Sequence, residues 1–115
     1  MRYLSVYYGP QDNHDIDPKK QEALGKLIAE MSQAGVFLGT EGCAPTSEGF
    51  RLRRVDGKLA VTDGPFAETK EVLGGYCMLE VKSKAEAVEW GRRFMAIMGE
   101  GYTETRLIMG STPAK

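Results

Sequence analysis

The sequence predicts an α+β fold of the ferredoxin-like type, in which strands and two helices follow the order βαββαβ and one β-hairpin is inserted. Short runs rich in branched and aromatic residues alternate with two stretches whose apolar residues recur at helical spacing. Asp56-Gly57, which lies between two such short runs, predicts a tight hairpin turn. The length of 115 residues predicts one domain over residues 1–115, with 110–115 as a loose tail.

The first half of the chain predicts a strand and a helix. Residues 2–8 are rich in aromatic and branched side chains, and Gly9-Pro10 ends this strand. Asp17 before Pro18 is a favourable N-cap followed by proline at the first helical position, which predicts a helix over residues 18–34. One apolar stripe follows it, formed by Leu24, Leu27, Ile28 and Met31.

After this helix, residues 36–38 predict a second strand that runs into a glycine-rich stretch over 39–45. The two strands of the hairpin are predicted over 50–55 and 58–62. A long connection over 63–75 then ends in Gly74-Gly75.

The last part of the chain repeats the pattern of strand, helix and strand. Residues 76–81 predict a strand, and Ser83 with Glu86 forms a capping box at the start of the second helix. Gly99 predicts the end of this helix, and residues 102–109 predict the final strand. The apolar stripe of the second helix consists of Ala87, Trp90, Phe94 and Met98.

The predicted sheet is apolar on both faces. In the first strand Tyr3 and Tyr7 alternate with Leu4, Val6 and Tyr8, so large side chains point to both sides. The βαββαβ order places both helices on one face, which leaves the other without cover. We therefore expect a homodimer in which two subunits pack sheet to sheet about a two-fold axis.

Composition excludes several classes of protein. The formal net charge of −1 argues against nucleic acid as a partner, because non-specific binding to phosphates needs a basic surface. No apolar run is long enough to span a membrane, and no secretory signal is visible, so a cytoplasmic location is expected. Cys43, Cys77 and His14 are too few and too scattered for a zinc site. No dinucleotide or phosphate-loop motif occurs, and we expect neither metal nor cofactor.

The run Asp63-Gly64-Pro65 is the most specific local signal for a site. Three turn-forming residues in succession define one backbone path, and a carboxylate stands at its start. One interpretation is structural: the Asp63 carboxylate accepts nearby backbone N–H groups and holds the turn. The other is catalytic: Asp63 acts as a general base at the edge of a pocket between the helices and the sheet.

Three further residues are candidates for binding. Glu41 follows a strand and is either a solvated carboxylate or a partner of Asp63 in a shared cleft. Arg53 shares one face of a hairpin strand with Arg51, which forms either a charged edge or a clamp for an oxyanion. Lys70 lies in the long connection, which is either a solvated loop or a lid that reaches a partner subunit.

The chain resembles the DGPF group of the YCII-related family over residues 1–109. The resemblance is carried by the N-terminal Met-Arg-Tyr, by Gly39-Thr40-Glu41-Gly42-Cys43-Ala44-Pro45, and above all by the run from Val61 to Tyr76. It implies a dimeric α+β barrel. It also implies an association with extracytoplasmic-function sigma factors, beside or fused to which some relatives are encoded. Certain relatives pair a histidine of the first helix with an aspartate, but His14 precedes that helix, so this dyad is not transferred.

Two functions follow from the sequence. The first is a dimeric protein that binds a small organic molecule, acting as a cofactor-independent isomerase or lyase with Asp63 as base and Arg53 or Lys70 as oxyanion partner. The second is a non-catalytic sensor or partner-binding module connected with sigma-factor-dependent transcription.

Overall fold

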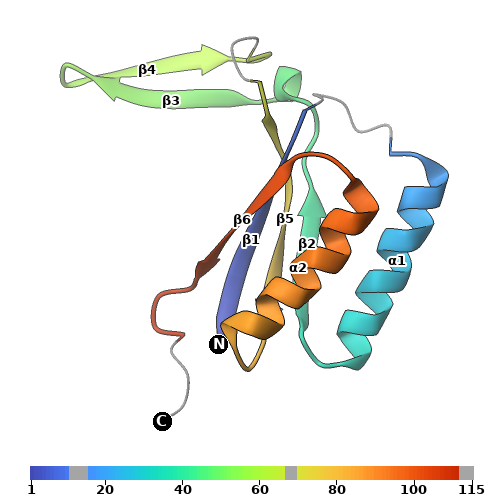
Figure 1. The fold of residues 1–115 in the computed structure, drawn as a ribbon. Helices are drawn as coiled ribbons and strands as arrows, with labels where there is room; N and C mark the ends of the chain where they lie inside the picture. The colour runs from blue at the N-terminus through green and yellow to red at the C-terminus, as the bar shows by residue number, and fades with distance from the viewer. Residues whose placement is uncertain (11–15, 67–69, 112–115) are drawn as a thin grey trace.

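The computed structural model describes residues 1–10, 16–66 and 70–111, and it confirms the ferredoxin-like α+β arrangement (Figure 1). Four strands form one antiparallel sheet in the order β2-β5-β1-β6, and β3 and β4 form a separate hairpin. The elements, in chain order, are β1 (Arg2–Gly9), α1 (Pro18–Gln33), β2 (Phe37–Gly42), a 3₁₀ turn η1 (Thr46–Glu48), β3 (Phe50–Val55), β4 (Lys58–Asp63), β5 (Val72–Glu80), α2 (Lys84–Met98) and β6 (Tyr102–Leu107).

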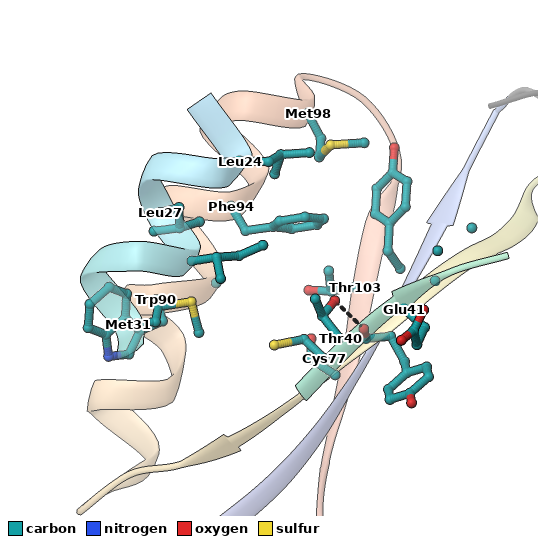
Figure 2. A pocket seen from close by; sticks show the side chains of 18 of the residues that line it. Leu24, Leu27, Met31, Thr40, Glu41, Cys77, Trp90, Phe94, Met98 and Thr103 are labelled. Atoms are coloured by element: carbon teal, nitrogen blue, oxygen red, sulfur yellow. Dashed lines mark hydrogen bonds between the residues drawn. The ribbon is translucent and has the colours of Figure 1, made fainter. Parts of the chain in front are cut away.

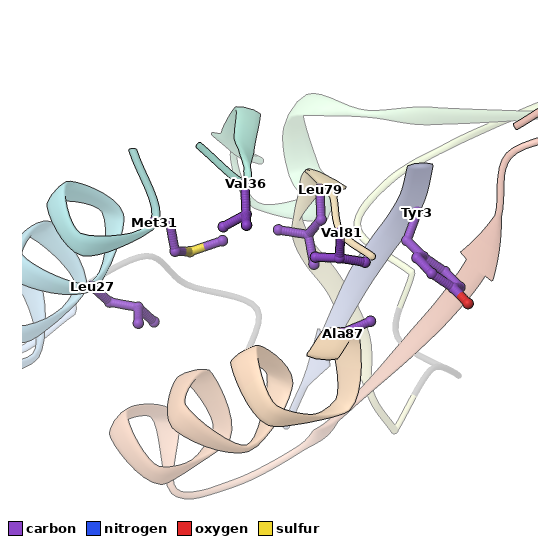
Figure 3. Packing of buried hydrophobic residues seen from close by; sticks show 7 residues of the cluster. All are labelled: Tyr3, Leu27, Met31, Val36, Leu79, Val81 and Ala87. Carbon is purple, nitrogen blue, oxygen red and sulfur yellow. The ribbon is translucent and has the colours of Figure 1, made fainter. Parts of the chain in front are cut away.

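Both helices cover the same face of the sheet, as the predicted topology requires (Figure 1). Between helices and sheet lies one cluster of buried apolar side chains, to which α1, α2, β1 and β5 all contribute (Figure 3). The cluster consists of Tyr3, Leu27, Met31, Val36, Leu79, Val81 and Ala87. We call the opposite side of the sheet, which no described element covers, the open face (Figure 1).

The predicted helix and turn signals are confirmed. The Asp17 side chain accepts a hydrogen bond of 2.7 Å from the Lys19 N–H, so it caps α1 as expected. The Ser83 hydroxyl accepts one of 3.1 Å from Glu86 N–H at the start of α2. Gly99 ends α2 in the left-handed conformation, at φ 80°. Asp56 and Gly57 both have positive φ, which is the backbone of the hairpin turn that their sequence predicts.

The boundaries of β2 and β5 differ from the prediction. β2 runs from Phe37 to Gly42, so the strand continues into the glycine-rich stretch that was expected to follow it. β5 begins at Val72, so the connection before it is shorter than expected and Gly74-Gly75 lies inside the strand. Gly75 pairs with both Tyr7 and Gly42, and a Cβ atom there would come within 2.6 Å of the Glu41 carbonyl oxygen. These glycines therefore allow close strand pairing rather than ending a loop.

The β3–β4 hairpin extends away from the sheet as an arm (Figure 1). Cross-strand pairing places Phe50, Leu52, Leu59 and Val61 on one face of this arm. These four side chains are 57–62% exposed, although all are apolar. Among the described residues, no helix is long and apolar enough to cross a membrane.

Candidate functional site

A pocket of about 280 Å³ lies between the two helices and the sheet, and we call it the helix–sheet pocket (Figure 2). Its upper wall is hydrocarbon and aromatic, because the apolar stripes of both helices face it. Its floor is made by the helix-facing side of the sheet. The helical wall includes Leu24, Leu27, Ile28, Met31, Trp90, Phe94 and Met98.

The pocket exists because the helix-facing side of the sheet changes in side-chain size from one row to the next. Cross-strand partners share a face, so each row contains one residue from each strand. The first row is large and apolar: Phe37, Leu79, Tyr3 and Leu107. The second is small and polar: Thr40, Cys77, Ser5 and Thr105. The third contains two glycines: Gly42, Gly75, Tyr7 and Thr103. The helices pack on Tyr3 and Leu79 of the first row, which are buried, and leave space over the other two rows.

Two hydroxyl groups in the lining donate their hydrogen atoms to the backbone. The Thr40 hydroxyl donates to the Tyr76 carbonyl oxygen over 2.6 Å, a contact drawn in Figure 2. The Tyr7 hydroxyl donates to the Glu100 carbonyl oxygen over 2.8 Å. Because each hydrogen is used in this way, the oxygen lone pairs of both groups remain as acceptors.

Tyr7 is held tightly by its surroundings. Added Cβ atoms at Gly9, Gly74 and Gly101 would each come within 3.0–3.1 Å of its side chain, so a larger residue at any of these positions would push the Tyr7 ring aside by a few tenths of an ångström. Its ring also makes an edge-to-face contact with Phe94, with a centroid distance of 5.5 Å. Burial, followed by the charges of Glu100 and Glu71, raises the pKa of the Tyr7 hydroxyl, which therefore stays protonated at neutral pH.

Cys77 lies on the pocket floor, and we expect its thiol to react slowly at neutral pH. Burial raises the pKa of this thiol to about 11, because a thiolate is poorly stabilised away from water. In a Cys43→Ser background, we expect alkylation of Cys77 by iodoacetamide to accelerate about tenfold per pH unit between pH 7 and 10. Mass spectrometry of timed samples measures this rate, and a rate that levels off near pH 8 would contradict the assignment.

The run Asp63-Gly64-Pro65-Phe66 begins at the end of the last strand of the arm and packs against η1. Gly64 N–H donates to the Gly49 carbonyl oxygen over 2.9 Å, and Phe66 N–H donates to Thr46 Oγ1 over 3.1 Å. The Arg51 guanidinium lies 3.9 Å from the centre of the Phe66 ring, a cation–π contact. The Gly64–Pro65 peptide bond is cis.

The residues predicted for the site lie at separate places in the fold. Asp63 ends β4 and is exposed, and within the described part of the chain no hydrogen bond or ion pair reaches its carboxylate. Arg53 is exposed on the arm, and Lys70 is exposed just before β5. None of these three lines the helix–sheet pocket. His14 lies outside the described residues.

Glu41 is the predicted site residue closest to the pocket. It belongs to the part of β2 that forms the pocket edge. Thr40 faces the helices, and successive side chains of a strand alternate, so the Glu41 carboxylate points to the open face (Figure 2). Among the described residues, no group of three or more Cys, His, Asp or Glu side chains is placed to hold a metal ion.

Sequence reasoning identified the helical stripes but missed the polar floor, namely Thr40, Cys77, Tyr7 and Thr103. The sequence does contain a sign of this floor: small residues recur in strands whose other residues are large, and Gly42, Gly74 and Gly75 lie near them. To recognise the floor one must know the register between the strands, which cannot be read from the sequence alone. Only the register brings these residues into adjacent rows.

The chain was compared with known proteins and protein families. The family model described as YCII-related domain matches residues 1–109. A similar protein, the uncharacterised protein R00369 of Rhizobium meliloti (strain 1021), is 33% identical over 76 residues, which is 66% of this chain. The match spans 61% of the length of that relative. Since the family model covers almost the whole chain, this protein belongs to the YCII-related domain family.

Proposed function

We propose that this protein is a homodimer that binds a small, mostly apolar organic molecule in the helix–sheet pocket. The observation that carries the proposal is the contrast between the two walls of this pocket. Seven hydrocarbon, thioether and aromatic side chains of the helices face a floor of small polar groups. Ligand sites in proteins have this composition, with an apolar lining and a few polar groups that orient the ligand.

The volume supports a ligand of about one ring. Drug-sized ligands occupy pockets of roughly 300–1,000 Å³, whereas an apolar cavity of about 150 Å³ holds benzene. At about 280 Å³, the helix–sheet pocket lies between these cases. A monocyclic compound with one or two short substituents fits this space.

The open face supports the dimer. Register and alternation place seven large side chains on it, and no described element of the same chain covers them. A stable interface requires about 800 Å² from each partner, and a patch of this kind marks an interaction surface. The side chains are Leu4, Val6, Tyr8, Leu73, Tyr76, Met78 and Tyr102.

Binding is tested with toluene as the probe and the fluorescence of the single tryptophan, Trp90, as the signal, because this side chain lines the pocket. We expect saturable quenching or a spectral shift. Gly91→Leu places a side chain where a Cβ atom meets open space at the pocket wall, and it should weaken binding at least about tenfold by filling the site.

The matched control is Gly25→Leu. Gly25 is also a helical glycine with open space around its Cβ position, but it does not line the pocket. We expect this variant to bind toluene as the wild type does. Equal binding by wild type and Gly91→Leu would overturn the assignment of the pocket.

The role of Asp63 as a catalytic base stays a prediction, and its alternative role as a structural turn residue can be tested separately. Since no described group bonds to its carboxylate, we expect Asp63→Asn to change the free energy of unfolding by less than about 0.5 kcal/mol. Toluene affinity should also be unchanged, because Asp63 does not line the pocket. Thermal denaturation and the Trp90 titration measure both; a lower melting temperature would favour the interpretation of Asp63 as a structural turn residue.

A non-catalytic sensor is the second candidate function. The uncharged floor favours it, because hydroxyl groups that donate to the backbone can hold a ligand but are poorly suited to proton transfer. The partner implied by the family resemblance is a sigma factor. Co-elution of the protein with an extracytoplasmic-function sigma factor, with and without toluene, tests this function, and elution as separate species in both conditions would argue against it.

A further inference from the structure

We infer that the ligand of the helix–sheet pocket is an uncharged, largely hydrocarbon molecule that carries a hydroxyl group and donates its hydrogen to Thr40 or Tyr7. This inference rests on the proposed function, because it concerns the ligand of the same pocket. It adds the charge of the ligand, the kind of polar group it carries and the protein atoms that receive it.

The lining excludes an anionic ligand. The described residues that line the pocket include no lysine, arginine or histidine. The one ionisable carboxylate among them, Glu41, points to the open face, as described above. A carboxylate or phosphate group would therefore lose its water without gaining a cation, which is strongly unfavourable in an apolar site.

The floor offers hydrogen-bond acceptors. Thr40 and Tyr7 direct their own hydrogens to the carbonyl oxygens of Tyr76 and Glu100. What each of these two groups presents to a bound molecule is an oxygen lone pair, so a donor on the ligand is complementary there. A pure hydrocarbon would supply no donor to the lone pairs of these oxygens.

Ser5, which also lines the pocket, accepts from the Thr105 hydroxyl over 2.9 Å and keeps its own hydrogen for an acceptor. A hydroxyl group on the ligand, which both donates and accepts, suits this combination.

The charges near Tyr7 are mixed. After burial, Glu100 and Glu71 raise the pKa of its hydroxyl, whereas the Lys20 ammonium donates to the Met98 carbonyl oxygen over 3.0 Å at the same end of the pocket. Hydrogen bonding and wall composition therefore carry the inference about the class of ligand.

The test compares three compounds of one ring: benzyl alcohol, benzyl methyl ether and benzoate. Trp90 fluorescence gives the dissociation constant of each. We expect benzyl alcohol to bind about fivefold more tightly than its methyl ether, although the ether is more apolar, because only the alcohol donates a hydrogen bond. We expect benzoate to bind at least about tenfold more weakly than the alcohol.

Variants then locate the acceptors. In Thr40→Val combined with Tyr7→Phe, the preference for the alcohol over the ether should disappear. Thr62→Val is the control, because Thr62 is an exposed threonine of the arm and does not line the pocket. It should keep the fivefold preference. Circular dichroism confirms that each variant is folded, and Thr40→Val alone is measured if the double variant is not.

The outcomes separate the two proposals. Failure of all three compounds and of toluene to bind would overturn the proposed function. Binding of toluene and of the ether at least as tight as that of the alcohol would leave the pocket as a ligand site and overturn the inference about the hydroxyl group. Tighter binding of benzoate than of the alcohol would overturn the inference about charge.

Discussion

Gly64→Ala is expected to destabilise the protein by about 3 kcal/mol and to lower its melting temperature by about 10 °C. A Cβ atom at this position would lie 1.7 Å from the Thr46 carbonyl oxygen and 2.6 Å from its carbonyl carbon. Both are backbone atoms, so no side-chain rotation relieves the overlap, and the arm and η1 must separate. The hydrogen bond between Gly64 N–H and the Gly49 carbonyl oxygen is then lost as well.

Thermal denaturation followed by circular dichroism measures this effect, and Gly25→Ala is its control. Gly25 is exposed in α1 and has no atom within 4 Å of its Cβ position, so alanine there should raise stability by up to about 1 kcal/mol through helix propensity. Glycine-to-alanine substitution is therefore expected to lower the free energy of unfolding at Gly64 and to raise it at Gly25. A Gly64→Ala protein as stable as the wild type would show that the run Asp63-Gly64-Pro65 does not pack on η1.

Val6→Lys is expected to convert the proposed dimer to a monomer. Val6 lies in the central strand β1, on the open face, paired with Tyr76 and Glu104. In a two-fold interface the substitution is present twice, and removing each ammonium group from water costs several kcal/mol. The dissociation constant of the dimer should rise at least about 100-fold.

Sedimentation velocity over a range of concentrations measures this change. Val88→Lys is the matched control, because Val88 is an exposed valine that lies on α2, away from the open face. It should remain dimeric. A wild-type protein that stays monomeric at high concentration would contradict the dimer, and a dimeric Val6→Lys protein would show that the open face is not its interface.

Much of the fold could be predicted because its signals are local. Asp17, Ser83 and Gly99 act within one helical turn, and Asp56-Gly57 determines a hairpin by its own backbone conformation. The helical stripes show which face of each helix meets the sheet. Caps, turns and helical periodicity depend on residues close together in the chain, so a single sequence is enough to predict them.

The site was harder to predict because it depends on contacts between distant residues. Gly74 and Gly75 resemble a loop in sequence, yet they belong to β5 because neighbouring strands approach them closely. The pocket arises where small residues of four strands fall into adjacent rows, and only the strand register brings them together. Asp63 was predicted as a site residue because Gly64 and Pro65 follow it. The structure explains much of this run by the packing of Gly64 and Phe66 against η1.

Binding of a small molecule in the helix–sheet pocket is tested most directly by a crystal structure of the protein equilibrated with toluene. We expect electron density for the ring between α1, α2 and the sheet, in contact with Trp90 and Phe94. A map in which these two side chains close the space, with toluene bound elsewhere or nowhere, would contradict it.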